Sequence, residues 1–362
     1  MTRKKVGIGV VGCGMISRIY LDNLSSYADT AIVACADLDP AKASAAADSV
    51  PSAVACSVGE ILRREDVQIV LNLTVPKAHF EVARAAIEAK KSVYCEKPLT
   101  LSYSEGRELL REAKANGVLV GCAPDTFLGA SAQLARQLLD SGSIGRAIGA
   151  QAFMLCHGHE SWHSNPDFYY QRGGGPMYDM GPYYLTALVN LLGSVKSVSG
   201  ATRKSFEERR ATSGQHAGRA IPVEVPTHVA GFLDFESGAL GTITTSFDVW
   251  KGSVPQIEIF GSEQSLSVPD PNGFGGEVKT GKGGDAWEGH PLIHQYSANS
   301  RGVGVLDMAL ALQQGREPRA SGALALHVLE IMEAIHRSAE QGARVQLETR
   351  CERPEPLPAS GL

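Results

Sequence analysis

A lysine placed directly after an apolar, strand-like run is the first residue of this chain whose position suggests chemistry. The run Ser92–Cys95 is followed by Glu96, Lys97 and Pro98. If the run is a buried parallel strand, Lys97 stands at its carboxyl end, where open α/β sheets bind ligands. Because proline disfavours helical geometry in the residue before it, Pro98 keeps Lys97 out of the next helix. The pattern predicts an ammonium group at the mouth of a ligand site, and a solvated charged turn is the alternative.

An acid and a phenol four residues apart form a second pair with chemical potential. Asp179 and Tyr183 follow the glycine triplet 173–175, and the sequence from Asp179 to Leu192 is typical of a helix. Residues four apart lie on one helical face, so the two groups would point to one place, where they could exchange a proton with a hydroxyl. The alternative is an acid favoured by the helix N-terminus and an unrelated buried tyrosine.

The segment 156–163 combines histidines with a tryptophan. His157 and His159 stand two apart, and Trp162 and His163 follow. Three interpretations are open: a zinc site, a structural histidine cluster and a substrate loop. We favour the substrate loop, because tryptophan faces stack on the C–H surfaces of sugars and imidazoles hydrogen-bond to hydroxyls.

A glycine-rich turn lies near the N-terminus, between a β-type run and a helical pattern. The run Val6–Val11 is followed by Gly12 and Gly14. A tight glycine turn that leads into a helix brings backbone N–H groups and the helix dipole to a pyrophosphate. The segment 7–12 also matches G-x-G-x-x-G, but its glycines would lie inside the strand, so we reject that register. The accepted register predicts a dinucleotide site in which Ser17, a small residue, takes the place of the usual third glycine.

An acidic residue ends the second predicted strand, residues 31–36. Asp37 lies 23 residues beyond Gly14. A carboxylate at this place accepts hydrogen bonds from the ribose hydroxyls of NAD and repels the 2′-phosphate of NADP. Leu38 follows where a basic residue would favour NADP, so we expect NAD as the cofactor and consider NADP the weaker candidate. A helix-capping role for Asp37 is the alternative, but Asp39 already occupies the capping position before a proline.

Polar residues also follow the predicted strand 69–73. Thr74 and Pro76 share the carboxyl edge with Lys97, where they could line the nicotinamide side of the site. His79, near the start of the next helix, could touch the cofactor or simply pack. The full set of expected cofactor contacts is Gly12, Gly14, Met15, Ile16, Asp37, Leu38, Thr74, Pro76, His79, Glu96 and Lys97.

Strand-like and helical segments alternate along the first third of the chain. About six β/α units end near Cys122. That alternation is typical of a parallel sheet covered by helices, and together with the glycine turn it predicts a Rossmann dinucleotide-binding domain over residues 1–124.

The pattern changes after this domain. β-type runs separated by Gly or Ser turns predict a second α/β domain, 125–362, built on a large, open, mostly antiparallel sheet. Two amphipathic helices, near 303–314 and 323–341, should pack on the core. The polar stretch 203–219 and the glycine-rich stretch 269–289 are expected to be surface loops.

Composition and charge narrow the classes of function. The chain has 362 residues and a net charge of −5, with charges of both signs interspersed. This balance favours neither nucleic acid nor a membrane surface as a partner. The seven cysteines are scattered without a metal-type pair, which indicates free thiols in a reducing compartment, the cytoplasm. The basic N-terminus precedes an apolar run that is too short and too rich in glycine for a signal peptide or a membrane span.

The order of these motifs resembles that of the Gfo/Idh/MocA oxidoreductase family over nearly the whole chain. The features that carry the resemblance are the glycine turn, Asp37, the segment 74–79, Glu96-Lys97-Pro98, the glycine triplet, Asp179 and Tyr183. The resemblance implies an N-terminal Rossmann domain and a C-terminal α/β domain with an open sheet. It also implies that Lys97 lies between nicotinamide and substrate, that the Lys97–Pro98 bond is cis, and that Asp179 and residue 183 flank the reacting hydroxyl. Tyr183 departs from the family pattern, because many relatives have histidine there.

We interpret the chain as an NAD-dependent oxidoreductase that transfers a hydride between nicotinamide and a secondary hydroxyl of a sugar, sugar derivative or cyclitol. The expected catalytic residues are Lys97, Asp179 and Tyr183. The expected substrate contacts are Asp125, His157, Trp162, His163, Asp179 and Tyr183. No metal is expected, because a lysine and a second acid–base group suffice for this chemistry.

Two alternatives share the same residues or the same fold. One is a redox-neutral NAD-dependent glycosidase, which oxidises a ring hydroxyl transiently, eliminates the aglycone and returns the hydride. The other is a catalytically silent NAD-binding regulator, against which an intact Lys97 argues. The exposed face of an open sheet also predicts a homo-oligomer, a dimer or a tetramer.

Overall fold

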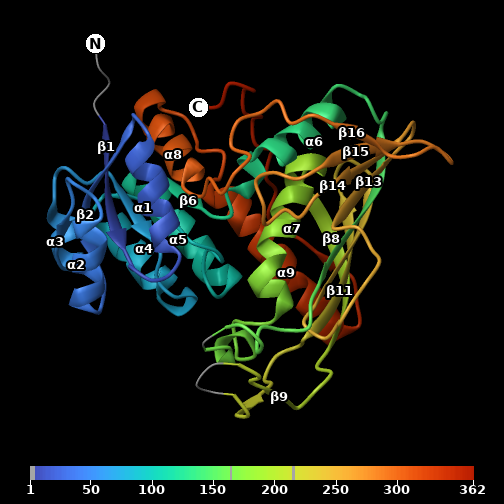
Figure 1. Ribbon diagram of the computed structural model, residues 1–362, viewed down its shortest axis with the longest axis horizontal. Coiled ribbons are helices and arrows are strands. Elements are labelled where there is room, and N and C mark those ends of the chain that lie inside the picture. Colours follow the sequence, from blue (N-terminus) through green and yellow to red (C-terminus); the bar gives the residue numbers. More distant parts are fainter. Residues whose placement is uncertain (1–4, 164, 214–216) are drawn as a thin grey trace. The chain divides into compact units, whose positions relative to one another are not determined.

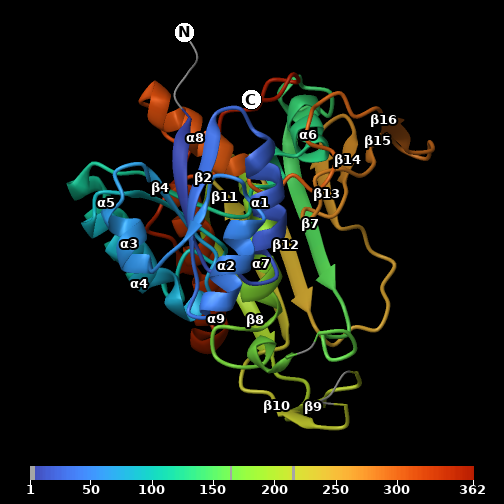
Figure 2. The same ribbon diagram turned by 60° about the vertical axis from the view of Figure 1, so that its left-hand side comes forward.

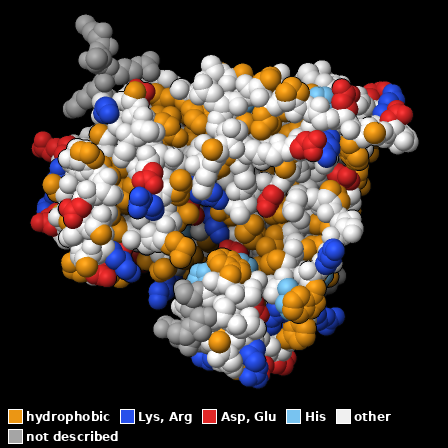
Figure 3. All heavy atoms as spheres, viewed as in Figure 1, with side chains coloured by type: hydrophobic (Ala, Val, Ile, Leu, Met, Phe, Trp, Pro, Cys, Tyr) orange, Lys and Arg blue, Asp and Glu red, His pale blue; other side chains and the backbone are white. Residues whose placement is uncertain are grey.

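The structure is a computed structural model that describes residues 5–163, 165–213 and 217–362 (Figure 1). All seven cysteines are free thiols. In the part of the chain that is described, no helix has the length and apolar character needed to cross a membrane. Acidic and basic side chains are interspersed on the face seen in Figure 3.

The chain divides into two compact units. The first runs to Gly129 and also includes Gln295–Leu326 and Leu357–Leu362. The second consists of Ala130–His294 and His327–Pro356. The chain passes from the first unit to the second after Gly129, close to the predicted boundary between residues 124 and 125. It then re-enters the first unit at Gln295 and again at Leu357, whereas the sequence predicted two domains that are each continuous in the chain.

The first unit is built on a six-stranded parallel sheet with the strand order β3-β2-β1-β4-β5-β6 (Figures 1 and 2). The strands are β1 (Val6–Val11), β2 (Thr30–Ala36), β3 (Val54–Ala55), β4 (Ile69–Asn72), β5 (Ser92–Cys95) and β6 (Val120–Cys122). The strand order reverses at β1, between β2 and β4. Ligands of such sheets bind at the carboxyl ends beside the reversal. The predicted Rossmann fold is therefore confirmed, and the turn after β1 lies at the ligand-binding edge.

Helices connect these strands, and local sequence signals set where they begin and end. The helices are α1 (Ser17–Ser26), α2 (Pro40–Asp48), α3 (Val58–Arg63), α4 (His79–Glu88), α5 (Tyr103–Asn116) and α8 (Val303–Gln314). Ser57 and Ser102 each form a capping box with the glutamate three residues on. Gly117 ends α5 in the left-handed conformation. Such caps satisfy backbone groups that the helix leaves unpaired, so they fix the helix boundaries.

The second unit is built on a nine-stranded sheet with the order β16-β15-β14-β13-β7-β12-β11-β8-β17. The strands are β7 (Ala147–Leu155), β8 (Val195–Arg203), β11 (His228–Phe235), β12 (Leu240–Ser246), β13 (Ile257–Gly261), β14 (Ser265–Val268), β15 (Val278–Gly281), β16 (Glu288–His290) and β17 (Val345–Gln346). All neighbouring pairs are antiparallel except β7 and β12, which are parallel. This large, mostly antiparallel sheet is the predicted fold class.

Helices cover one face of this sheet. They are α6 (Ala130–Asp140), α7 (Pro176–Leu192) and the greater part of α9 (Gly322–Gln341) (Figure 1). Helix α7 packs against β7, β11 and β12. Helix α9 approaches closely because Gly200 and Gly231 have no side chain: a Cβ on Gly231 would lie 2.7 Å from Cδ1 of Ile335. The helix that carries Asp179 and Tyr183 is therefore fixed on a rigid sheet.

Two stretches that were expected to be loops contain strands instead. Residues 203–219 include β9 (Glu208–Arg210), which pairs with β10 (Ala220–Pro222) in a separate hairpin. Residues 269–289 include β15 and most of β16, which extend one edge of the large sheet. These strands are short and mostly polar. They lack the longer apolar alternation that marks a half-buried strand in a sequence, which is why the prediction missed them.

Candidate functional site

The glycine turn of the first unit lies directly after β1. Gly12 has a φ of +95°, and a Cβ there would come within 2.7 Å of the Leu73 carbonyl, so only glycine fits. At Gly14, by contrast, a Cβ would meet no atom within 4 Å, which leaves the backbone open to an approaching phosphate. The N–H and hydroxyl of Ser17 donate to the Gly14 carbonyl at 3.1 and 2.7 Å. The glycines of the rejected register lie within β1 and at its end.

Asp37 follows β2 and is tied to this turn. Its Oδ2 accepts a hydrogen bond from the N–H of Cys13 at 2.7 Å, and its Oδ1 accepts one from the N–H of Asp39 at 2.9 Å. Asp39 caps α2, as the sequence indicates. These bonds fix the Asp37 carboxylate beside the turn while each oxygen keeps a lone pair for a ribose hydroxyl.

Exposed apolar side chains flank the Cys13–Asp37 hydrogen bond. Met15 is 85% exposed, Ile16 is 37% exposed and Leu38 is fully exposed. Apolar groups that gather beside an open backbone are typical of a surface that a ligand covers. They fit the faces of an adenine ring, so the residues at this edge fit a dinucleotide.

Thr74 and Pro76 continue the same edge after β4. The Thr74 hydroxyl donates to Oδ1 of Asn72 at 2.6 Å, and the Asn72 amide donates to the carbonyl of His79 at 3.0 Å. Pro76 opens a short 3₁₀ helix, η1 (Pro76–Ala78). Asn72 is completely buried, and sequence reasoning missed it. The signal was present, because a polar residue in the last position of an apolar strand needs partners.

His79, which was expected either to touch the cofactor or to pack, packs inside the fold. Its side chain is fully buried, with Nδ1 2.6 Å from the Pro98 carbonyl oxygen and Nε2 3.0 Å from the Thr74 carbonyl oxygen. Burial lowers the pKa of His79, against the effect of the two carbonyl oxygens. With both nitrogens facing backbone carbonyls, His79 joins the loop after β4 to the loop after β5. It positions Thr74 and Pro98, and its side chain has no surface exposed to a cofactor.

Lys97 stands two residues after the end of β5, at the predicted edge, and its peptide bond to Pro98 is cis. The preceding carboxylate is engaged on both oxygens: Glu96 accepts from the Tyr20 hydroxyl at 2.8 Å and from the N–H of Lys97 at 2.9 Å. Burial raises the pKa of Tyr20 well above its ordinary value, so this phenol remains a donor. Glu96 therefore contributes to this edge by holding Lys97 in place, and Tyr20 is a supporting residue that the sequence did not reveal.

Asp125, which was expected to contact the substrate, is buried among backbone groups of its own unit. It is 1% exposed, and its Oδ2 accepts hydrogen bonds from the N–H groups of Gly302 and Gly304 at 2.8 and 3.0 Å. Burial raises its pKa to about 6, against the effect of these two donors. Asp125 anchors the start of α8 to the end of the first sheet.

The acid–base pair of the second unit lies on α7. The helix begins at Pro176, so Asp179 stands in its first turn and Tyr183 one turn later on the same face. Gly175, just before the helix, has a φ of +88°. Tyr183 is buried, with 8% of its surface exposed. The predicted juxtaposition of a carboxylate and a phenol on one helical face is present.

His159 reaches this pair from the segment 156–163. Its Nε2 lies 3.4 Å from Oδ2 of Asp179, and its ring stacks on Tyr169 with centroids 3.9 Å apart. The side chain is buried, and its Nδ1 has no hydrogen-bond partner among the described residues. The sequence placed His159 in the loop but did not assign it to the site. Its distance from Asp179 along the chain, 20 residues, hid the contact.

The other residues of this loop that were expected to contact the substrate have separate partners. Trp162 is 64% exposed and contacts the ring of His163 edge-on. His163 packs on Tyr169 as well, and its Nδ1 accepts from the N–H of Asn165 at 3.1 Å. His157 turns to a different partner and stacks on Trp250. The loop therefore presents His159 to α7, while His157 lines a separate cavity.

The zinc interpretation of this loop finds no ligand set in residues 5–163, 165–213 and 217–362. No three His, Cys, Asp or Glu side chains in these ranges are arranged to hold a metal ion. His159 instead contacts Asp179 and an aromatic ring.

Two family descriptions match the chain. The one described as an oxidoreductase family with an NAD-binding Rossmann fold matches residues 6–123. The one described as the GFO/IDH/MocA C-terminal domain matches residues 132–267. One match lies in each unit of the structure.

Similar proteins span nearly the whole chain. D-xylose 1-dehydrogenase (NADP(+)) 2 of Haloferax volcanii is 26% identical over 347 residues, which cover 94% of this chain and 98% of the relative. Inositol 2-dehydrogenase of Rhizobium meliloti is 23% identical over 346 residues, covering 94% and 99%. Among solved structures, levoglucosan dehydrogenase in complex with NADH and levoglucosan matches with a TM-score of 0.81 at 20% identity, covering 96% of this chain and 100% of the other.

Proposed function

The chain belongs to the Gfo/Idh/MocA family of oxidoreductases, and from that premise we propose that it is an NAD-dependent dehydrogenase acting on a secondary hydroxyl of a sugar, sugar derivative or cyclitol. The observation that carries the proposal is the position of Lys97, held by Glu96 after β5 at the same sheet edge as the glycine turn. The relatives named above act, by their names, on xylose and inositol. A polyhydroxylated substrate is the class that these two share.

The preference for NAD rests on Asp37. Its carboxylate is fixed by Cys13 and Asp39, and Leu38 beside it supplies no positive charge. A 2′-phosphate would meet a negative charge at this place, whereas a ribose hydroxyl would donate a hydrogen bond to it. The remaining proposed contacts are Gly12, Gly14, Met15, Ile16, Leu38, Thr74 and Pro76.

The proposed chemistry assigns one task to each residue. NAD, when bound, accepts the hydride that leaves the carbinol carbon. The Lys97 ammonium stabilises the negative charge that develops on the substrate oxygen. Tyr183, in its phenolate form, takes the hydroxyl proton, and Asp179 orients it or the substrate. His159 positions the Asp179 carboxylate through the 3.4 Å contact, while Trp162, His157 and His163 contribute the polar and aromatic surface of the substrate loop.

Self-association is part of the proposal. Phe153, Phe232 and Leu240 lie on the outer face of the large sheet, and the last two are 41% and 49% exposed. An exposed apolar sheet face is typical of a subunit interface, so we infer a homo-oligomer, a dimer or a tetramer. The free thiols support a cytoplasmic location as a further part of the proposal. Light scattering of the purified protein measures its mass.

The decisive experiment follows NADH and aglycone release together. The enzyme is incubated with NAD and a panel of free sugars, cyclitols and aryl glycosides. Stoichiometric NADH from a free polyol, lost in Tyr183→Phe, supports the dehydrogenase. Catalytic aglycone release without net NADH would contradict it in favour of the redox-neutral glycosidase, because in that cycle the hydride returns to the product.

A further inference from the structure

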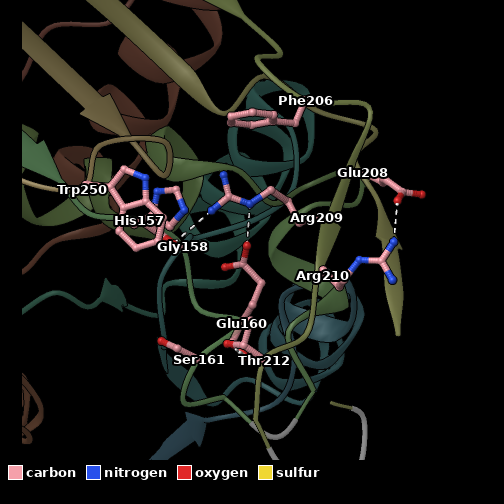
Figure 4. A pocket seen from close by; sticks show the side chains of 10 residues that line it. All are labelled: His157, Gly158, Glu160, Ser161, Phe206, Glu208, Arg209, Arg210, Thr212 and Trp250. Carbon is pink, nitrogen blue, oxygen red and sulfur yellow. Dashed lines mark hydrogen bonds and ion pairs between the residues drawn. The ribbon is translucent and has the colours of Figure 1, made fainter. Parts of the chain in front are cut away.

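A cavity in the second unit is not used by the proposed chemistry. It has a volume of about 570 Å³ and lies between the segment 157–161, the β9 strand and the loop after β12 (Figure 4). Cavities of this size hold ligands as large as one or two small rings. Its walls are formed chiefly by His157, Phe206, Arg209 and Trp250.

A buried arginine fixes the walls of this cavity. Arg209 is 7% exposed and pairs with Glu160 and, at 2.8 Å, with Asp248. It also donates to the carbonyl of His157 at 3.0 Å, and its guanidinium lies over the ring of Phe206 at 5.3 Å. One side chain thus joins three separate segments of the chain. The cavity is preorganised, so a ligand does not have to order it.

The charges around the cavity are already paired. The guanidinium of Arg209 faces two carboxylates, and Arg210 pairs with Glu208 on the same strand. The second oxygens of Glu160 and Asp248 accept from the hydroxyls of Tyr170 and Thr227. A phosphate or carboxylate would find no uncompensated cation among these groups, so an anionic ligand is disfavoured.

The wall next to the substrate loop is an aromatic platform. The rings of Trp250 and His157 stack with centroids 3.3 Å apart and planes inclined by 16°. Trp250 nevertheless remains 82% exposed, and Phe206 is 48% exposed. Trp250 stacks on His157 and is otherwise largely exposed, so it offers a surface for the C–H face of a sugar or for another ring. Because the ring is already oriented by His157, binding costs little further side-chain entropy.

The platform and the proposed catalytic pair each contact one short segment, through His157 and His159 respectively. His157 stands two residues before His159, which contacts Asp179. Two residues span at most roughly 7 Å along the backbone. A ligand that occupies the cavity is therefore held by the same segment that supports the proposed catalytic carboxylate.

We propose that this cavity binds a second, neutral sugar ring of a disaccharide or glycoside whose other ring is oxidised. The inference rests on the proposed dehydrogenase function, because it identifies the part of the substrate that does not react. Stacking on Trp250 would give such substrates tighter binding than the corresponding monosaccharide.

Binding measurements test the cavity without requiring turnover. Isothermal titration of the full-length protein uses glucose, maltose, cellobiose, sucrose and UDP-glucose, without NAD. At least one neutral disaccharide should bind about tenfold more tightly than glucose. Trp250→Ala should abolish this difference, and Trp250→Phe should retain most of it. Trp287→Ala, at an exposed tryptophan of the β15–β16 hairpin, is the matched control and should change nothing.

The outcomes separate this inference from the proposed function. If every disaccharide binds like glucose, if Trp250→Ala keeps the preference while circular dichroism shows a folded protein, or if UDP-glucose binds most tightly, the inference is overturned. NADH formation is measured in parallel. Disaccharide binding that depends on Trp250, without NADH from any sugar, would support the cavity and contradict the dehydrogenase. NADH formation without any disaccharide preference would support the dehydrogenase and contradict the proposed role of the cavity.

Discussion

The dinucleotide edge of the first unit and the substrate loop of the second are held in place by different kinds of contact. At the edge, the contacts of Asp37 and His79 are to backbone groups: Asp37 to the N–H of Cys13, and His79 to the carbonyls of Thr74 and Pro98. In the loop, the central contacts are buried ion pairs between side chains, with Arg209 between Glu160 and Asp248. Backbone groups are common to all residue types, whereas a side-chain cluster depends on each member. We therefore expect substitutions in the segment 156–163, the proposed substrate loop, to alter the substrate more readily than the cofactor.

Arg209→Met is expected to have the largest effect, because it removes the cation of the buried cluster that Arg209 forms with Glu160 and Asp248. The substitution leaves Glu160 and Asp248 buried without their cation, and such a loss costs about 3–5 kcal/mol of unfolding free energy. Urea unfolding measures it. Arg210→Met, in the same strand but with an exposed pair, should cost less than about 0.5 kcal/mol. Equal effects of the two substitutions would show that the loop does not depend on its buried cluster.

Lys97→Met tests the edge at its proposed catalytic group. Turnover should fall on the order of a hundredfold or more, because the developing charge on the substrate oxygen loses its stabilising ammonium. Affinity for NAD should stay within a factor of about three, since backbone groups hold the cofactor edge. Stopped-flow turnover and calorimetric titration measure the two quantities. Lys114→Met, on α5, is the control, and a folded Lys97→Met enzyme with near-normal rate would remove Lys97 from the mechanism.

Asp125→Asn tests whether a buried carboxylate of the first unit acts only in structure. Its pKa of about 6 in the folded protein lies above that of an unfolded aspartate. The neutral form is thus favoured by folding, so its contribution to stability is present below pH ~4 and lost as the pH rises through 6. The unfolding free energy of Asp125→Asn relative to the natural protein should rise by about 2 kcal/mol between pH 4 and pH 7.

The check for that substitution is a pair of urea titrations across this pH range. Asp48→Asn, at an exposed position of α2, is the control and should follow the natural protein. A constant difference between Asp125→Asn and the natural protein would contradict the raised pKa. If Asp125→Asn lost more activity than the loss of folded protein explains, Asp125 would be assigned to the substrate site again.

The smallest expected effect concerns cofactor choice. NAD should bind at least about tenfold more tightly than NADP, because the 2′-phosphate meets the Asp37 carboxylate. Asp37→Ser should bring the two affinities close together, mainly by improving NADP binding. Calorimetric titration with both dinucleotides measures the ratio, and equal affinities in the natural protein would remove Asp37 as the selector.

The parts of the molecule that the sequence predicted are those in which neighbouring residues act together. The strand Val6–Val11, the turn at Gly12 and the cap at Asp39 each depend on a few consecutive residues. Lys97 and the pair on α7 were found because a strand end and a helical spacing place their side chains. For these features, the conformation that the local sequence favours is also the one that the tertiary structure requires.

The features that the sequence did not reveal depend on contacts between distant segments. Arg209 meets Glu160 from 49 residues away, and Asp125 meets Gly302 from 177 residues away. Nothing near either residue distinguishes it from a surface charge. His79 illustrates the intermediate case, since its helix was predicted and its inward direction was not.

Asp125 also has a consequence for the order in which the chain can fold during synthesis. The edge strand β6 of the first sheet is completed by residues made much later: Cys122 donates to the carbonyl of Ala320, and Gly121 forms a bridge with Ser321. The ribosome must therefore translate the entire 130–294 insertion before the N-terminal unit receives its last layer. Until then an unpaired strand edge and the Asp125 carboxylate stay open to water. A nascent chain stalled before residue 295 would be a natural client of chaperones.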